Sequence, residues 1–207
     1  MFTGIVAAVG RITSITPLGS DPDAGVRLQI HAGTLPLADV ALGDSIALNG
    51  ACMTVTHKTD DSFTVDVSRE SLRLTVGLDR EGEVNLEKAL TLADRIGGHL
   101  VSGHVDGLGT VVGFAAVGES WKLDILAPQS LAKYFAYKGS VVVNGVSLTV
   151  NSVADSADGC TISINLIPHT IEVTTLRHLQ PGHRVNLEVD LIARYVERML
   201  ASTALPR

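Results

Sequence analysis

Two short segments that repeat within the chain carry the residues best suited to chemistry. Asn49-Gly50-Ala51-Cys52-Met53-Thr54-Val55 returns as Asn144-Gly145-Val146-Ser147-Leu148-Thr149-Val150. The repeat places a thiol in the first copy and a hydroxyl in the second, each just after an Asn-Gly turn signal. Both also have a structural interpretation, since a strand cysteine is usually a small buried hydrophobe and a serine beside a turn often satisfies backbone groups. We predict a functional role for both because this is the segment that the duplication has kept most alike.

A glycine-rich run, Gly97-Gly98-His99-Leu100-Val101-Ser102-Gly103-His104-Val105-Asp106-Gly107, adds two histidines. Residues five apart lie on opposite faces of a strand, and no cysteine, histidine or carboxylate set at ligand spacing accompanies them, so the run does not predict a metal site. A histidine, with an ordinary pKa of about 6.5, is instead suited to moving a proton. His104 stands where the first copy has Ile5, so the two copies are chemically unequal there.

Two more positions distinguish the copies. Lys138 stands opposite Gly43, and Leu166-Ile167-Pro168-His169-Thr170 stands opposite Val67-Ser68-Arg69-Glu70-Ser71. Two similar pockets, of which one carries extra ionisable groups, are expected where two like molecules are handled in unlike roles.

The elements that position these residues are predicted to be strands of a duplicated domain. Two further anchors repeat in the same order: Val84-Asn85-Leu86-Glu87 returns as Val185-Asn186-Leu187-Glu188, and Phe2-Thr3-Gly4-Ile5-Val6 has a looser counterpart in Val101-Ser102-Gly103-His104-Val105. Three anchors at nearly one offset indicate two copies of one unit. Short runs rich in Val, Ile and Thr, separated by turn signals, favour small closed barrels or sandwiches. The clearest such runs are residues 27–31, 45–48, 53–57, 62–67, 140–143 and 161–166.

Helical signals are few. Short helical turns are expected near residues 35–40 and 129–137. The last stretch differs, because Ile192, Tyr195, Val196 and Met199 follow the spacing of one apolar helix face. Such a terminal helix packs either on its own barrel or on other subunits.

Composition limits the class of protein. The chain has 207 residues, 45% hydrophobic and 18% charged, with a formal net charge of −6. This apolar content excludes a disordered chain, and the acidic balance argues against nucleic acid as a partner. No stretch is long and apolar enough to span a membrane, the start lacks the positive region of a signal peptide, and two cysteines are too few for a disulfide framework. We therefore expect a soluble, cytoplasmic protein.

Taken together, MFTGIV, NGACMTV, GGHLVSGHVDG, YKGS, VNGVSLTVN, NLIPHT and VNLEVD resemble the riboflavin synthase family, alpha-chain type, over essentially the whole chain. The resemblance implies an all-β fold of two tandem six-stranded antiparallel Greek-key barrels plus a C-terminal amphipathic α-helix. The domains would be residues 1–97 and 98–189, with residues 190–207 forming a trimerisation helix and tail.

The implied reaction is the dismutation of two 6,7-dimethyl-8-ribityllumazine molecules to riboflavin and 5-amino-6-ribitylaminouracil, without added cofactor or metal. The site would lie between the first barrel of one subunit and the second barrel of a neighbour in a homotrimer. Some relatives are enclosed by a lumazine synthase capsid, which makes lumazine synthase a candidate partner.

The family's substrate-binding residues carry over by matching positions. The first pocket would comprise Gly4, Ile5, Val6, Cys52, Met53, Thr54, Asp66, Val67, Ser68, Arg69, Glu70 and Ser71. The second would comprise Gly103, His104, Val105, Lys138, Ser147, Leu148, Thr149, Asn165, Leu166, Ile167, Pro168, His169 and Thr170. Three residues of the first pocket depart from the family pattern: Arg69 replaces a common proline, Ser71 a threonine and Met53 a leucine.

Catalytic roles are a hypothesis built on this resemblance. His104, Ser147 and Thr149 would handle the proton of the molecule that is deprotonated. Cys52 would act on the acceptor, either as a transient nucleophile or by positioning water. Asp190 matches a family acid near the site but is equally an N-cap of the last helix. The alternative function is that of a non-catalytic lumazine- or flavin-binding protein of the same fold, which the pocket residues retained in the second copy disfavour. A purely structural trimer of barrels would leave the likeness of the two polar turn segments unexplained.

Overall fold

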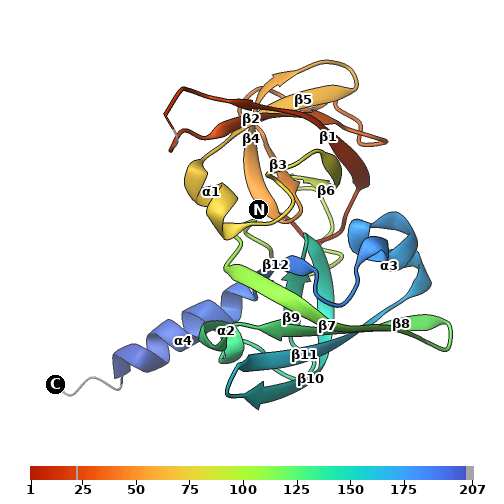
Figure 1. Ribbon diagram of the computed structural model, residues 1–207, viewed down its shortest axis with the longest axis vertical. Helices are drawn as coiled ribbons and strands as arrows, with labels where there is room; N and C mark the ends of the chain where they lie inside the picture. Colours follow the sequence, from red (N-terminus) through yellow and green to blue (C-terminus); the bar gives the residue numbers. More distant parts are fainter. Residues whose placement is uncertain (22, 204–207) are drawn as a thin grey trace.

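Each copy of the repeat closes into a six-stranded antiparallel barrel, with the two barrels stacked one above the other (Figure 1). The computed structural model describes residues 1–21 and 23–203, so residues 204–207 of the predicted tail lie outside the described residues. The first barrel contains β1 (Ala8–Pro17), β2 (Val26–His31), β3 (Ser45–Leu48), β4 (Ala51–Lys58), β5 (Ser62–Val67) and β6 (Gly82–Lys88). The second contains β7 (Gly107–Val117), β8 (Ser120–Ala127), β9 (Ser140–Val143), β10 (Val146–Ser156), β11 (Gly159–Leu166) and β12 (Arg184–Val189).

The two barrels have the same strand order. Around the first barrel the order is β1-β2-β5-β4-β3-β6, and the corresponding strands of the second follow the same path, with β7 closing on β12. Alternate residues of each strand face inward, as Leu28 and Ile30 do on β2, and each barrel fills its own apolar core. The predicted all-β duplication is thus confirmed. The six predicted runs all lie in strands, three of which extend one to three residues beyond the prediction.

The short helices differ from the prediction. Residues 35–40 are not helical, because Pro36 cannot donate a helical hydrogen bond and Leu35, Leu37 and Val40 instead pack irregularly into the barrel core. Residues 129–137 contain only α2 (Gln129–Ala132). Two helices that the sequence did not predict, α1 (Arg69–Leu74) and α3 (Pro168–Val173), follow β5 and β11, and a 3-10 turn, η1 (Thr175–His178), follows α3.

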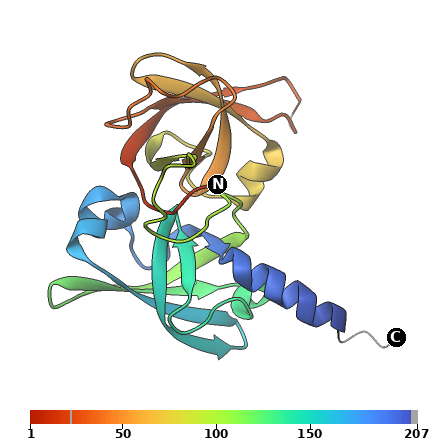
Figure 2. The same cartoon turned by 180° about the vertical axis from the view of Figure 1, so that it is seen from behind.

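The terminal helix α4 (Leu191–Thr203) extends away from both barrels (Figures 1 and 2). Its first turn is held to the second barrel by Arg194, whose guanidinium lies 2.7 Å from the Asp106 carboxylate. Further along, Glu197 pairs with Lys133 at 2.5 Å. The apolar stripe is nevertheless open to solvent, with Ile192 67% and Tyr195 63% exposed. The helix is therefore attached to its own barrel by polar contacts, while its apolar face has room for another surface.

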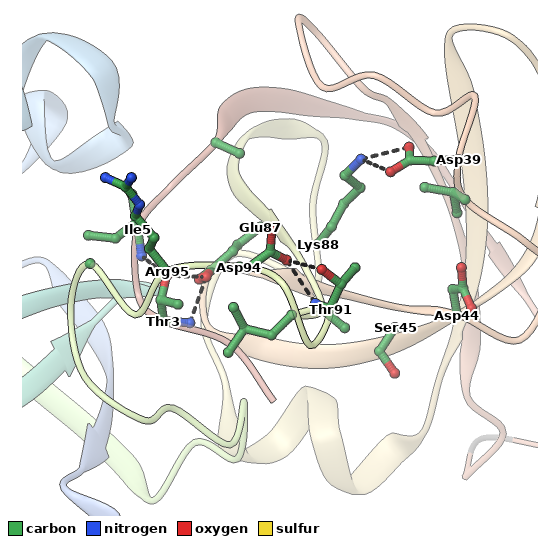
Figure 3. A pocket seen from close by; sticks show the side chains of 15 residues that line it. Thr3, Ile5, Asp39, Asp44, Ser45, Glu87, Lys88, Thr91, Asp94 and Arg95 are labelled. Carbon is green, nitrogen blue, oxygen red and sulfur yellow. Dashed lines mark hydrogen bonds and ion pairs between the residues drawn. The ribbon is translucent and has the colours of Figure 1, made fainter.

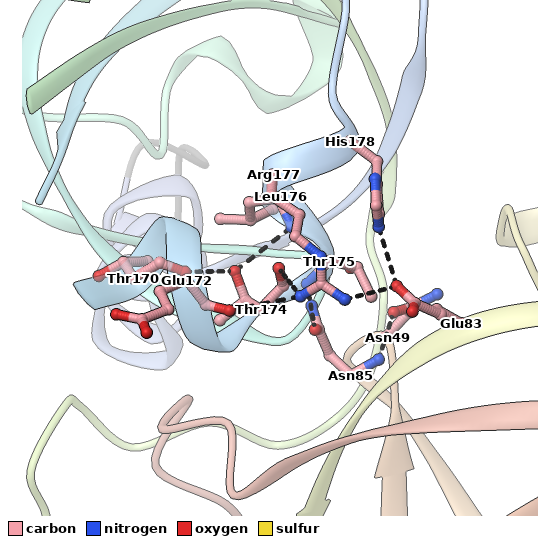
Figure 4. Close-up of polar contacts among 10 residues, drawn as sticks. All are labelled: Asn49, Glu83, Asn85, Thr170, Glu172, Thr174, Thr175, Leu176, Arg177 and His178. Atoms are coloured by element: carbon pink, nitrogen blue, oxygen red, sulfur yellow. Dashed lines mark hydrogen bonds and ion pairs between the residues drawn. The ribbon is translucent and has the colours of Figure 1, made fainter. Parts of the chain in front are cut away.

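Four buried asparagines join the barrels in a nearly symmetric network. Asn85 on β6 donates to the Asn144 carbonyl at 2.8 Å, and Asn186 on β12 donates to the Asn49 carbonyl at 3.0 Å. Figure 4 shows Asn85 also accepting from the backbone of Thr175 in the second barrel. The Asn and Gly residues that repeat in both copies thus form the contact between barrels.

The Asn-Gly turns themselves pack back to back. A β-carbon on Gly50 would lie 2.9 Å from the Gly145 nitrogen, and one on Gly145 would lie 2.8 Å from the Gly50 nitrogen. Both glycines have positive φ, as the turn requires. Part of the likeness between the repeated segments therefore has a structural cause, which weakens it as an argument for the function of Cys52 and Ser147.

Candidate active site

The segment that begins each repeat contacts the other barrel. The two predicted pockets join residues 4–6 to Cys52 and residues 103–105 to Ser147. This grouping is wrong. The Ser147 amide instead donates to the Gly4 carbonyl at 2.7 Å, and the Cys52 amide donates to the Gly103 carbonyl at 2.8 Å. Side-chain packing agrees, because Val6 packs on the core of the second barrel and Val105 on the core of the first. Each candidate site is thus completed by residues of the other copy.

Two buried glutamates fix these exchanged segments. Glu87 on β6 accepts hydrogen bonds from the Thr3 amide and hydroxyl at 2.7 Å and from the Gly4 amide at 3.0 Å. Glu188 on β12 does the same for Ser102 and Gly103. Burial raises the pKa of both carboxyl groups, and these hydrogen bonds oppose the rise. The repeated Val-Asn-Leu-Glu motif therefore joins the barrels through its asparagine and positions the exchanged segment through its glutamate.

His99 is the functional candidate that the sequence prediction missed. Its Nδ1 lies 2.7 Å from the Ser147 hydroxyl. The close approach depends on Gly98, because a β-carbon there would lie 2.8 Å from the Ser147 Oγ and would meet the Thr3 carbonyl oxygen. Burial lowers the pKa of His99, so the neutral imidazole able to accept a proton is favoured. The adjacent Gly-Gly pair was the sequence signal for this approach.

Asp190 lies at the start of α4 and has a structural role. Its Oδ1 accepts from the Ile192 amide at 2.9 Å, which confirms the N-cap interpretation. Its negative charge also acts on His99, where it opposes the effect of burial on the pKa. The acid is therefore electrostatically coupled to the His99–Ser147 pair.

Cys52 has a different environment. Its half-buried thiol packs on the apolar cluster between the barrels that contains Phe2, Ala47 and Val101. Phe2 is fully buried there. Within residues 1–21 and 23–203, no hydrogen bond links Cys52 to a histidine. The two copies thus present a thiol in an apolar setting and a hydroxyl bonded to an imidazole.

The other predicted residues of the second copy are mostly at the surface. His104 and Thr149 are exposed. Lys138 is exposed and its Nζ donates to Asn151 at 2.9 Å. Asn165 accepts from the Ser120 hydroxyl at 3.0 Å, and residues 168–170 form the first turn of α3.

In the first copy, the predicted residues surround the start of α1. Asp66 forms a two-pronged pair with Arg27 at 2.7 and 2.9 Å, and this partner holds the pKa of the Asp66 carboxyl below its usual range. Ser68 caps α1 by accepting from the Ser71 amide at 3.0 Å, and Arg69 and Glu70 are exposed on its first turn.

Some predicted contact residues point inward. The side chains of Met53, Val67 and Leu166 are buried in the barrel cores, so only their backbone groups are available to a ligand. The replacement of a family leucine by Met53 is therefore a core substitution.

Two cavities of the chain lie beside the candidate residues rather than over them. One of about 570 Å³ is bounded by Lys88, Thr91, Asp94 and Arg95 and reaches Ile5 (Figure 3). Another of about 730 Å³ lies between the barrels next to Asn49 and Asn144. Among the predicted site residues, only Ile5 lines either cavity.

Within the described ranges there is no group of three or more His, Cys, Asp or Glu residues arranged to hold a metal ion. No helix in those ranges is long and apolar enough to cross a membrane.

Comparison with known proteins defines the class. The lumazine binding domain family model matches twice, at residues 3–89 and 102–190, once for each barrel. Solved structures of LumP share the fold. LumP complexed with 6,7-dimethyl-8-(1'-D-ribityl) lumazine is 26% identical, with a TM-score of 0.75 over 91% of this chain and 99% of that chain. LumP complexed with riboflavin is 28% identical, with a TM-score of 0.77 over 92% of this chain and 100% of that chain.

Curated relatives narrow the class. Riboflavin synthase of Mycobacterium tuberculosis (strain ATCC 25618 / H37Rv) is 46% identical over 98% of this chain and 99% of its own length. Riboflavin synthase of Photobacterium phosphoreum is 45% identical over 97% of this chain and 89% of its own, and that of Bacillus subtilis (strain 168) 41% over 97% and 90%. The chain belongs to the riboflavin synthase family.

Proposed function

We propose that this chain catalyses the transfer of a four-carbon unit between two 6,7-dimethyl-8-ribityllumazine molecules, giving riboflavin and 5-amino-6-ribitylaminouracil. The observation that carries the proposal is the pair of equivalent but unequal positions, Ser147 beside His99 and Cys52 in an apolar setting. A reaction between two identical molecules needs one to lose a proton and the other to accept the resulting nucleophile. Two like sites with different chemistry provide for this division.

The second barrel holds the molecule that loses a proton from its 7-methyl group. One hydrogen bond of 2.7 Å joins the His99 imidazole to the Ser147 hydroxyl. This pair moves a proton near that carbon. His104 and Thr149 remain further candidates for this step. Cys52 acts on the acceptor molecule in the first barrel, and Asp190 supports the charge of His99.

Alignment supplies most of the acceleration. Because the substrate itself provides the acidic carbon and the heterocycle that delocalises the anion, the protein mainly brings two molecules together. Proximity of this kind is worth roughly 7–11 kcal/mol of barrier, whereas a positioned acid or base contributes about 10²–10⁴-fold in rate.

The site lies between subunits of a homotrimer joined through α4. The exposed Ile192 and Tyr195 provide an apolar face for this contact. The open position of His104 and Thr149 supports completion of the site by a neighbour. Cys52 and Cys160 are both free, which fits a reducing cytoplasmic location. Enclosure by lumazine synthase remains part of the same proposal.

The direct test is to mix purified protein with the lumazine and follow riboflavin absorbance. Turnover is expected, whereas a fluorescence change without product would favour the non-catalytic binding function. Ser147→Ala and His99→Gln should each lower kcat by about 10²-fold or more, as expected for loss of a proton-transfer group. Ser152→Ala, on the same strand but outside the site, is the matched control and should retain the wild-type rate. Normal turnover of both site variants, with unchanged oligomeric state, would refute their assignment.

A further inference from the structure

Lys138 has a backbone conformation that a residue with a β-carbon rarely adopts. Its φ is 64°, in the left-handed region, and the corresponding residue of the first copy is Gly43 with φ 93°. The turns are otherwise equivalent, because the Lys138 amide donates to the Val150 carbonyl at 2.7 Å and the Gly43 amide to the Val55 carbonyl at 2.9 Å. Glycine satisfies this turn without strain, so the lysine side chain needs a reason other than folding.

The neighbouring strand contains a matching difference. Lys138 Nζ donates to Asn151 Oδ1 at 2.9 Å. The corresponding residue in the first copy is Thr56, whose hydroxyl lies 2.9 Å from that of Thr64 on the adjacent strand. Both residues stand where the strand pairing shifts register, so the backbone irregularity is common to the two barrels. The second copy thus differs by a pair of residues, a strained lysine and the amide that holds it.

The pair lies on the same face as the proposed proton-transfer group. Ser147, Thr149 and Asn151 alternate along β10, and alternate residues of a strand share one face. Ser147 at one end contacts His99, and Asn151 at the other contacts Lys138. This face therefore has an imidazole at one end and an ammonium group at the other.

The ammonium group is held by a neutral partner. Among the described residues, Lys138 forms no ion pair with a carboxylate, and its other close contact is the Tyr137 ring, 5.2 Å from Nζ. An amide oxygen orients an ammonium group without neutralising it, and two of the three N–H donors remain available. Such a group is suited to binding an anion or an oxygen that becomes negative.

We propose that Asn151 is a positioning residue that holds the Lys138 ammonium group toward the lumazine anion formed when the 7-methyl group loses its proton. The inference rests on the proposed function and deepens it. The negative charge of this anion spreads from the 7-methylene carbon into the heterocycle, and the ammonium group stabilises it by hydrogen bonding and charge. The proton that leaves goes to the His99–Ser147 pair, so Lys138 changes neither its protonation nor its bonding.

The test compares Asn151→Thr, which installs the residue of the first copy, with the wild type. We expect kcat to fall about tenfold with little change in KM, because misplacing a group that stabilises charge in the reaction weakens the transition state more than substrate binding. Exchange of the 7-methyl protons with deuterated water should slow by the same factor. Thr56→Val, at the matching position of the first barrel, is the control and should retain wild-type kcat and exchange.

A double-mutant cycle separates positioning from a general structural effect. Lys138→Ala should lower kcat by about 10²-fold, and adding Asn151→Thr to it should cause no further loss. Lys138→Gly, which copies Gly43, should lose activity to the same extent while unfolding at a higher temperature than the wild type. Additive losses, or normal kcat and exchange in Asn151→Thr or Lys138→Gly, would overturn the inference. Failure of the wild type to form riboflavin would instead overturn the proposed function.

Discussion

Ser147 and Cys52 show how one backbone position can serve two chemistries. Each amide donates to the carbonyl of a glycine from the other copy, Gly4 or Gly103. The side chains then meet different neighbours: the hydroxyl has an imidazole at 2.7 Å, and the thiol has an apolar cluster. The chemical difference between the two positions therefore depends on residues outside the repeated NGxxxTV segment, above all His99.

The pKa of His99 makes a prediction about stability. Burial lowers this pKa below its ordinary value of 6.5, so the folded protein keeps the ring neutral to a lower pH than the unfolded chain does. As the pH falls from above 6.5 through this window, the unfolded chain takes up the proton first and the wild type loses stability. His99→Gln should lack this component, so the difference in unfolding free energy between the two proteins should change with pH.

Urea unfolding at a series of pH values measures this difference. His57→Gln replaces an exposed histidine away from the site and should follow the wild-type curve. Parallel curves for the wild type and His99→Gln across the whole range would contradict the prediction.

At the scale of elements, strands and turns were predictable where local residues decide the structure. Short runs rich in Val, Ile and Thr between turn signals predicted strands such as β5 and β9, because β-branched residues favour extended backbone. The helices α1 and α3 escaped prediction, since each is only six residues long and buries no side chain completely. Their existence depends on caps such as Ser68 and on the barrel ends against which they lie, and a helical periodicity is too short to detect there.

The paired Asn-Gly turns predict a specific loss of stability. Gly145→Ala adds a β-carbon where φ is +83° and where the Gly50 nitrogen would be 2.8 Å away. Gly118→Ala is a matched control, because its φ is +61° but nothing lies within 4 Å. Both should lose roughly 1–2 kcal/mol to left-handed strain, and Gly145→Ala about 1–3 kcal/mol more from displaced packing between the barrels. Equal losses in thermal or urea unfolding would show that the turns do not pack tightly.

The helix α4 predicts the oligomeric state. Replacing both Ile192 and Tyr195 by lysine places charge on the exposed apolar face and should convert the proposed trimer to monomers. Analytical ultracentrifugation measures the change, and riboflavin formation should be lost with it. Arg198→Gln, on the exposed polar side of the helix, is the control and should leave the trimer intact. Active monomers of the double variant would refute a site between subunits.

At the scale of the whole molecule, the duplication was readable but the exchange of segments was not. Three repeated anchors sufficed to predict two barrels, because each barrel is built from contacts within one copy. The grouping of Gly4 with Cys52 was wrong because the decisive contacts, from Ser147 to Gly4 and from Glu87 to Thr3, join residues more than eighty positions apart. His99 was missed for the same reason, since its partner Ser147 is 48 residues away in sequence and close only after both barrels have formed.

The crossing of the two amino-terminal segments also limits how such a protein can evolve. The effect of a substitution at Gly4 should depend on the residue at position 147, in the other half of the gene, more than on the neighbours of Gly4 in sequence. Recombination that replaces one half by that of a diverged homologue would place mismatched residues at both crossed contacts, Ser147 with Gly4 and Cys52 with Gly103. Selection must therefore act on the tandem gene as a single unit, even though each half encodes a complete barrel.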